Sequence, residues 1–308
     1  MKDDAWLEKK QDATLSIKTH GNLISTQIEK NWIQFNTNSH HNNNSIRTSK
    51  MATGIVITQQ ALYNTGLFKE WSHEAFNNLN DIGVSQHASL GTVAQEMGKD
   101  LREIDLHSYI GVCRIHNHFK LNSEEVVELS FGSCLNDRLT KVQSSAGVAY
   151  LNPVQVKGGS ETAPIPYMWA FDKVTRLFFP VQFFDGSNVI MRQRFVEIVT
   201  EKRDQLVDFL SRFIDRVSTN SVEDDMGFYI RYDNLISRQA GETLVEDTCV
   251  EDRQQWILPI TKAAMQQSLA EKRKTHPTAF TSQTHWYFDD NSCVGTVDCS
   301  GHCIAHRY

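Results

Sequence analysis

Residues 166–217 decide the fold of this chain: PYMWAFDKVTRLFFPVQFFDGSNVIMRQRFVEIVTEKRDQLVDFLSRFIDRV. The first half contains two aromatic runs on either side of the polar turn 172–175, a pattern typical of a β-hairpin. Pro180 lies in the second run, which predicts a sheet edge or a bulge there. The second half, 189–217, places apolar residues at helical spacing opposite a charged face. It predicts one long amphipathic helix.

Helical and extended patterns alternate along the remainder of the chain. Helical patterns occupy 58–106 and 260–273, and extended patterns occupy 109–115, 137–185 and 227–235. Residues 122–130 suit a helix that begins at Asn122, although Val126 and Val127 leave a strand open. We therefore expect an α+β fold, with a mixed α/β fold as the alternative. In this fold a central, mostly antiparallel sheet packs against the long helix.

Charge and hydrophobicity limit the partners that the chain can have. Its 308 residues carry a formal net charge of −6, and 40% of them are hydrophobic. A weakly acidic surface argues against electrostatic binding to nucleic acid or to an anionic membrane. No apolar run approaches the roughly 18 residues that a membrane span needs. We expect no nucleic-acid or membrane partner, whereas a small-molecule ligand and any oligomeric state remain open.

The first 50 residues differ in composition from the rest. Within them, 36–50 (NTNSHHNNNSIRTSK) contains Ile46 as its one aliphatic residue and cannot bury a core. We expect 1–50 to be a disordered or marginal polar leader, either a natural extension or a product of start-site choice. A single α+β domain with a Cys/His-rich C-terminal tail then covers 51–308. Acidic residues interrupt any secretory signal at the start, which predicts a cytoplasmic protein with reduced thiols.

Two histidines in the segment GVCRIHNHFKLNSEEVVELSFG (111–132) are the first candidate site. On one strand, His116 and His118 would project from the same face and present two imidazoles to one point. With Glu125, or the adjacent Glu124, as a nearby carboxylate, they could hold zinc or iron while leaving coordination positions open. Two other interpretations are open: a general acid–base pair without metal, or histidines with a purely structural role.

The spacing of this segment is similar to the first metal motif of the cupin family, in which Gly, His-x-His, Glu and Gly follow one another at set intervals. The six residues between Glu125 and Gly132 match that motif, whereas the gaps before His116 and after His118 differ. A second cupin motif is absent from the sequence. The resemblance implies that His116, His118 and Glu125 are metal ligands, and it implies oxygen or isomerase chemistry.

The same segment also resembles uncharacterised fungal proteins that carry a His-x-His-Phe-x-Leu pattern before an acidic stretch. Here the pattern is His116-Asn-His118-Phe119-Lys-Leu121. This second resemblance implies a cytosolic α+β chain and carries no activity.

Cysteine and histidine cluster again at the C-terminus. Cys293, Cys299, Cys303 and His306 follow a C-x5-C-x3-C-x2-H spacing and offer four ligands to a tetrahedral zinc ion. The paired C-x2-C steps typical of zinc modules are absent. Inert thiols, redox-active thiols and a site shared with His116 and His118 are the alternatives.

Two hypotheses on function follow from these clusters. In the first, the chain is an accessory or structural protein in which the Cys and His clusters are mainly structural. In the second, it is a metal-dependent enzyme that uses the His116/His118 pair on a small molecule. No nucleotide-binding, nucleophile-elbow or H-E-x-x-H motif is present to favour another class of enzyme.

Overall fold

The computed structural model describes residues 60–80, 89–132, 148–155, 164–249, 253–275, 281–288 and 293–300. Spatial contacts divide the chain into two compact units, Met1–Lys50 and Met51–Tyr308. All described residues belong to the second unit. The predicted polar leader 1–50 lies outside them.

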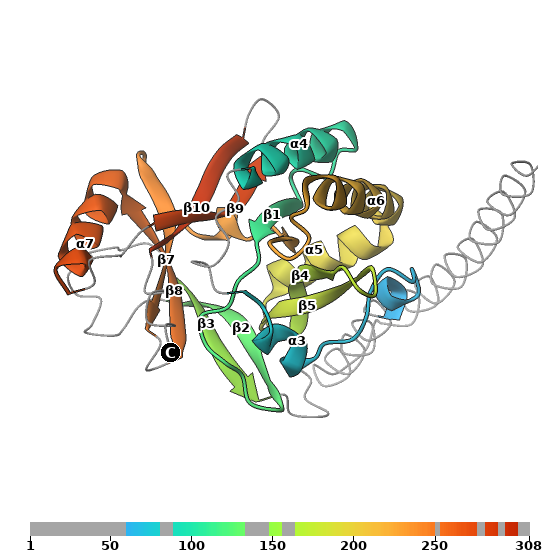
Figure 1. The fold of residues 1–308 in the computed structure, drawn as a ribbon, viewed down its shortest axis with the longest axis horizontal. Coiled ribbons are helices and arrows are strands. Elements are labelled where there is room, and N and C mark those ends of the chain that lie inside the picture. Colours follow the sequence, from blue (N-terminus) through green and yellow to red (C-terminus); the bar gives the residue numbers. More distant parts are fainter. Residues whose placement is uncertain are drawn as a thin grey trace, which may run out of the picture. The chain divides into compact units, whose positions relative to one another are not determined.

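Strands in the described residues form a closed barrel (Figure 1). They are β1 (Ile110–Arg114), β2 (Glu125–Gly132), β3 (Val148–Gln155), β4 (Ile165–Asp172), β5 (Leu177–Phe184), β6 (Met226–Ile230), β7 (Glu242–Cys249), β8 (Gln254–Thr261), β9 (Thr281–Phe288) and β10 (Cys293–Ser300). Their order around the barrel is β1-β6-β4-β5-β2-β3-β8-β7-β10-β9, and β9 pairs with β1 to close it. The β2–β5 and β7–β10 pairs are parallel and the others are antiparallel. Closure gives every strand two neighbours.

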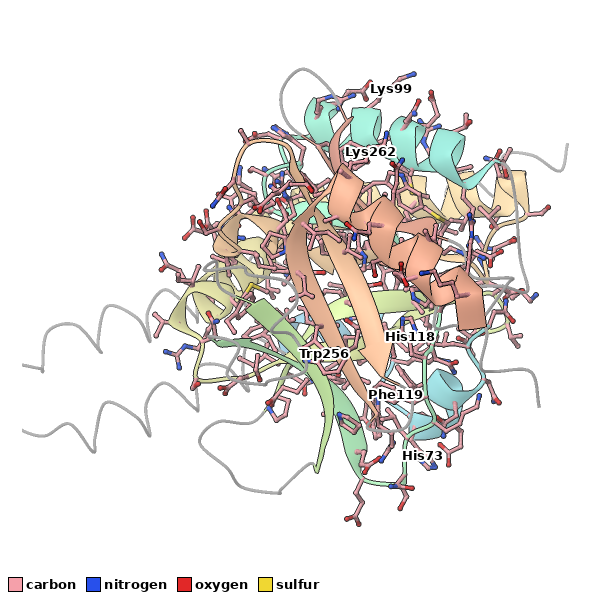
Figure 2. The ribbon with its side chains drawn as sticks, turned by 90° about the vertical axis from the view of Figure 1, so that its left-hand side faces the viewer. His73, Lys99, His118, Phe119, Trp256 and Lys262 are labelled. Carbon is pink, nitrogen blue, oxygen red and sulfur yellow. The ribbon has the colours of Figure 1, made fainter. Side chains whose placement is uncertain are left out.

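Helices cover the barrel on two sides. They are α3 (His73–Asn77), α4 (Leu90–Glu103), α5 (Val189–Thr200), α6 (Arg203–Asn220), α7 (Lys262–Thr275) and the short 3-10 helix η2 (Asp233–Leu235). α4 contacts β1, β9 and α6, and α5 contacts β6 and α6. α7 lies apart from these helices, against β7 and β8 (Figures 1 and 2). The expected α+β fold with a mostly antiparallel sheet is confirmed, and this sheet is closed into a barrel.

The predicted single helix over 189–217 is wrong, because α5 ends at Thr200 and α6 begins at Arg203. The polar run TEKRDQ at 200–205 separates the two apolar segments and offers no side chain to anchor a continuous helix. Each segment therefore docks separately on the curved barrel. Phe195 and Ile198 are buried from α5, and Phe209 and Phe213 are buried from α6.

The aromatic hairpin is confirmed as β4 and β5. Pro180 lies opposite Trp169 beside a register shift, so its missing N–H falls at an irregularity and the bulge alternative is correct. Between this hairpin and the helices, Trp169 stacks on Phe228 with ring centroids 4.9 Å apart. Phe178 packs edge-on against Phe228 at 5.3 Å. Apolar packing of this kind is what joins the helical layer to the barrel.

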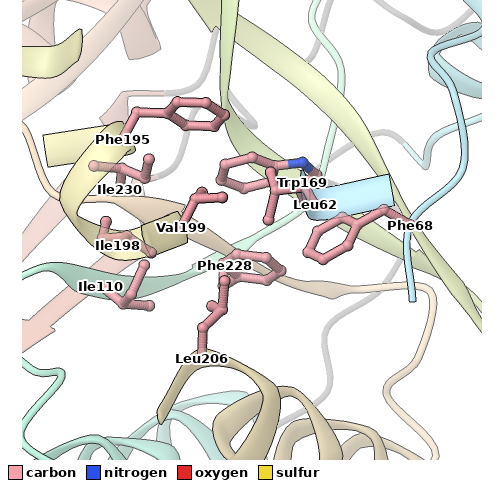
Figure 3. Close-up of a pocket in the computed structure, with 10 residues that line it drawn as sticks. All are labelled: Leu62, Phe68, Ile110, Trp169, Phe195, Ile198, Val199, Leu206, Phe228 and Ile230. Carbon is pink, nitrogen blue, oxygen red and sulfur yellow. The ribbon is translucent and has the colours of Figure 1, made fainter. Parts of the chain in front are cut away.

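A small cavity in this layer is lined entirely by hydrophobic residues (Figure 3). Phe195, Ile198 and Val199 come from α5, Phe228 and Ile230 from β6, and Trp169 from β4. The lining offers no ionisable group. Acid–base or metal chemistry must therefore be sought elsewhere in the molecule.

Three other predicted segments differ from the observed elements. The helix suggested for 122–130 is wrong, and the strand alternative is confirmed as β2, in keeping with the β-branched Val126 and Val127. The predicted strand 227–235 ends at Ile230, and η2 follows it. The first strand ends at Arg114, before the two histidines of the first candidate site.

Two glycines in α4 give a matched test of how this helix packs. A Cβ built at Gly98 would lie 2.3 Å from the ring of Phe288, a fully buried side chain on β9, whereas a Cβ at Gly91 meets nothing within 4 Å. We expect Gly98→Ala to lower the free energy of unfolding by about 1–3 kcal/mol through overpacking. Gly91→Ala should leave it unchanged or slightly higher, because alanine favours helix. Urea unfolding of the two variants measures this, and equal effects would contradict the described packing.

Candidate metal centre

The two histidines predicted as a pair are brought together, but by a loop rather than by a strand. Asn117, between them, is buried and fixed to the segment around α3. Its backbone N–H donates to the Asn80 carbonyl at 3.3 Å, and its side-chain amide donates to the Phe76 carbonyl at 3.2 Å. With Asn117 held in this way, His116 and His118 extend to a common point. Figure 2 shows His118 and Phe119 on this segment.

Glu246 of β7 completes a group of three potential metal ligands. One nitrogen from each histidine and one Glu246 oxygen all lie within 4.8 Å of one another. The two Nε2 atoms are 2.9 Å apart, and His116 Nε2 is 3.9 Å from Glu246 Oε2. His118 and Glu246 are 5% and 1% exposed, so the group is sheltered from bulk water. Two imidazoles and one carboxylate are a donor set that binds zinc or iron(II).

The tautomer of His116 suits a ligand. Its Nδ1 lies 3.0 Å from the Arg114 carbonyl, and because a carbonyl only accepts, Nδ1 carries the proton in this hydrogen bond. In the neutral ring, Nε2 therefore presents a lone pair toward His118. Either His118 donates a proton to it, or both nitrogens face one cation. Ligands about 2.0–2.1 Å from a metal ion are about 2.9–3.4 Å from each other, which includes the observed separation.

Glu246 is held by a hydrogen-bond chain from β9. Thr284 Oγ1 donates to Glu246 Oε2 at 3.2 Å and lies 3.1 Å from His285 Nδ1. A β-bulge makes this chain possible: His285 pairs with Val297 and Gln283 pairs with Asp298, so Thr284 is the extra residue. Thr284 and His285 can then both approach the carboxylate, although neighbours in a regular strand face opposite sides.

Burial governs the ionisation of these groups. It raises the pKa of Glu246 to about 7, against a lowering by the Thr284 hydrogen bond. Burial, with the nearby His116, lowers the pKa of His285 to about 3, so this ring is neutral at neutral pH. A divalent cation would favour both the ionised carboxylate and the neutral imidazoles.

Tyrosines adjoin the group on the inside of the barrel. The rings of Tyr229 and Tyr232 lie 4.9 and 6.1 Å from that of His285, and Tyr167 lies 5.6 Å from Tyr232. Burial raises the pKa of all three hydroxyls well above the usual value, so they stay protonated. Gly111 makes room for Tyr229, because a Cβ there would lie 2.4 Å from its ring.

Glu125, predicted as the carboxylate beside the histidines, makes a different set of contacts. Arg253 donates to both of its oxygens, at 3.2 Å and 2.5 Å, and the Asn122 backbone N–H donates to it at 2.8 Å. These partners, led by the Arg253 hydrogen bond, lower the pKa of Glu125 to about 2. Within the described residues, the ligand group joins His116 and His118 to Glu246 and does not include Glu125.

The structure does not describe the side chains of the predicted C-terminal site. Cys293 and Cys299 lie on β10, where the backbone of Cys299 pairs with that of Glu246, but their side chains are not described. Cys303 and His306 lie outside the described residues altogether. Zinc binding by this cluster stays a prediction.

Sequence reasoning missed Glu246, Thr284 and His285. A usable signal was present in ETLVEDTC (242–249). In an extended segment, Leu244, Glu246 and Thr248 lie on the same side of the strand, so Glu246 shares the side of an apolar residue. A carboxylate on the buried side of a strand needs a hydrogen-bond donor or a cation beside it. The Thr284 bulge leaves no comparable mark in the sequence.

In comparisons with known proteins, no family model, curated protein or solved structure matches the chain. Among the helices that the structure describes, none is both long and apolar enough to cross a membrane.

The Glu125–Arg253 ion pair predicts a definite pH dependence. Because the folded pKa of Glu125 is about 2 against an ordinary 4.5, its stabilising effect is fully present above pH 4.5 and is lost as the pH falls toward 2. We expect Glu125→Gln to lower the free energy of unfolding at pH 6, and the difference from the wild type to shrink to nothing near pH 2. Urea unfolding at a series of pH values measures it. A difference that is independent of pH would rule out the ion pair as its source.

Proposed function

We propose that this protein is a metal-dependent enzyme that acts on a small molecule, with His116, His118 and Glu246 holding one divalent ion, zinc or iron(II). The observation that carries the proposal is the convergence of three ligand atoms within 4.8 Å, from the loop after β1 and from β7. These segments are more than 100 residues apart in the sequence, so local chain geometry does not explain their meeting.

Chemical function follows from the number of ligands. Structural zinc sites use four protein ligands, whereas catalytic sites use three and leave a position for water or substrate. A bound zinc ion would act as a Lewis acid and lower the pKa of its water, and iron(II) would supply oxygen chemistry. The Arg114 carbonyl fixes the His116 tautomer, and Thr284 orients the Glu246 carboxylate. Outer contacts of this kind are usual around metal ligands.

The accessory or structural hypothesis is the alternative. The 2.9 Å contact between His116 and His118 favours it, because a direct hydrogen bond between the rings would hold the loop without any ion. A cytoplasmic location and the absence of nucleic-acid binding also stay predictions from composition.

Metal content separates the two hypotheses. The full-length protein, purified without chelators and loaded with Zn²⁺, Fe²⁺ or Co²⁺, should retain close to one equivalent by elemental analysis. It should also unfold at a higher temperature than the metal-free form. His116→Ala and Glu246→Gln should lose the ion, and Glu125→Gln is the matched control that keeps it. Retention below about a tenth of an equivalent would count against the metal centre.

The C-terminal cysteines need their own control in that experiment. A variant with Cys293, Cys299 and Cys303 all replaced by serine should keep the ion bound at His116, His118 and Glu246. If this variant loses the ion while His116→Ala retains it, the metal belongs to the C-terminal cluster.

Thr284 offers a finer test of the proposed centre. Thr284→Val preserves the shape of the side chain but removes the hydroxyl that donates to Glu246, and Thr284→Ser restores it. We expect the valine variant to bind Co²⁺ about 10- to 100-fold more weakly, and the serine variant to bind close to wild-type affinity. Spectrophotometric titration measures both. Equal affinities for valine and wild type would show that the hydroxyl does not orient the ligand.

A further inference from the structure

The loop that carries both histidines is fastened to α3 a second time, beyond His118. We call residues 115–121, which follow β1, the histidine loop. Asn77 is the last residue of α3, and its side chain makes two hydrogen bonds to the backbone of Leu121. It accepts from the Leu121 N–H and donates to the Leu121 carbonyl, each at 2.8 Å. His118 thus lies between two residues, Asn117 and Leu121, that are both held by the α3 segment.

α3 is held in place by contacts that do not involve the histidine loop. A helix this short is not stable in isolation, so it depends on capping and packing. Ser72 caps its N-terminus by accepting from the Ala75 N–H at 3.3 Å. Phe76 is 3% exposed within the main hydrophobic cluster, and the Trp71 ring lies 6.5 Å from that of Phe183 on β5. α3 can therefore serve as a fixed base for the loop.

Side chains, rather than strand pairing, order the second half of the histidine loop. After Asn117, the backbone hydrogen bonds described for this loop go to side chains: Asn77 binds Leu121, and Arg253 donates to the Lys120 carbonyl at 2.7 Å. Fixing the backbone of one residue costs about 1–2 kcal/mol of conformational entropy. A loop that is fixed before a ligand arrives does not incur this cost on binding, so its affinity for the ligand is higher.

We propose that α3, through Asn77, positions the His116/His118 pair for the metal ion, and that metal binding in turn stabilises α3. This inference rests on the proposed function, since it concerns the ligands of the same centre. Asn77 acts through the backbone of Leu121 and is therefore a positioning residue. Because coupling between two events is reciprocal, whatever α3 adds to the metal affinity returns as added stability of α3 when the ion binds.

Two variants of Asn77 in the full-length protein test the positioning. Asn77→Ala removes both hydrogen bonds to Leu121, and Asn77→Leu removes them while keeping a side chain of similar size. Each should bind Co²⁺ about three- to tenfold more weakly than the wild type, the value of one or two hydrogen bonds. The visible absorption per bound cobalt should also change, which a loss of stability alone would not cause. Wild-type affinity and absorption in both variants would overturn the inference.

Asn188→Ala is the matched control, because Asn188 is the N-cap of α5 and belongs to the helical layer. Its side-chain oxygen accepts from the Met191 N–H at 3.0 Å. Loss of this cap should lower the free energy of unfolding by about 1 kcal/mol, which urea unfolding measures beside the Asn77 variants. Co²⁺ affinity should stay at the wild-type value. If Asn188→Ala weakens Co²⁺ binding as much as Asn77→Ala does, the effect is one of general stability and the inference fails.

Hydrogen exchange measures the coupling in the reverse direction. In α3, the Phe76 N–H donates to the Ser72 carbonyl at 3.1 Å, and the Asn78 N–H donates to the Glu74 carbonyl at 3.0 Å. Saturating Zn²⁺ should slow the exchange of these two amides in the wild type by a factor comparable to the affinity change, and it should leave their exchange unchanged in Asn77→Ala. Equal exchange with and without bound zinc in the wild type would contradict the coupling.

The failure of each proposal has its own signature. If metal binds and both Asn77 variants bind it as the wild type does, the positioning role alone fails. If the wild-type protein binds no metal, the metal centre fails, and the imidazole nitrogen chemical shifts of His116 and His118 are compared at constant pH in the metal-free protein. A change in Asn77→Ala that Asn188→Ala lacks would keep the positioning of the pair by α3, and no change would dismiss it.

Discussion

The burial of Glu246 inside a closed barrel is the constraint around which the rest of the site is arranged. A carboxylate removed from water is costly unless hydrogen bonds or a cation compensate it. At 1% exposure, Glu246 meets this requirement through Thr284 on one side and faces two imidazoles on the other. A buried carboxylate can be stabilised by a bound proton, by a hydrogen bond or by a metal ion. Thr284 supplies a hydrogen bond to Glu246, and His116 and His118 could share a metal ion with it.

Several features of the fold serve this arrangement. Barrel closure brings β1, β9 and β7 around one interior, although they come from distant parts of the sequence. The bulge at Thr284 aims two adjacent side chains at one carboxylate. The anchored Asn117 turns the chain after β1 so that both histidines face inward. The helical layer packs on the barrel largely through aromatic and aliphatic side chains, and none of the three grouped ligands comes from it.

The sequence predicted the structure correctly where a short local pattern determines it. The aromatic hairpin followed from its turn residues, and the choice of a sheet edge or a bulge at Pro180 followed from the missing N–H of proline. The pairing of His116 with His118 followed from their spacing, although the loop that presents them did not. The break between α5 and α6 was missed because a polar run at helical spacing is compatible with a continuous helix as well as with two helices.

The hydrophobic periodicity of the sequence does not show which distant strands pair to close the barrel. Strand pairing between β7 and β10, or between β1 and β9, leaves no local mark, so Glu246 could not be assigned to the histidines in advance. Glu125 was the carboxylate that the spacing to Gly132 favoured, but Arg253 binds it, and that arginine is 128 residues away. The choice of carboxylate thus depended on tertiary structure.

X-ray absorption spectroscopy of the zinc- or cobalt-loaded full-length protein tests the central claim most directly. The account predicts a first shell of nitrogen and oxygen alone at about 2.0–2.2 Å, with the outer scattering of two imidazoles. It also predicts that Glu246→Gln abolishes this signal. Sulfur ligands at about 2.3 Å would instead assign the metal to cysteines and contradict the centre formed by His116, His118 and Glu246.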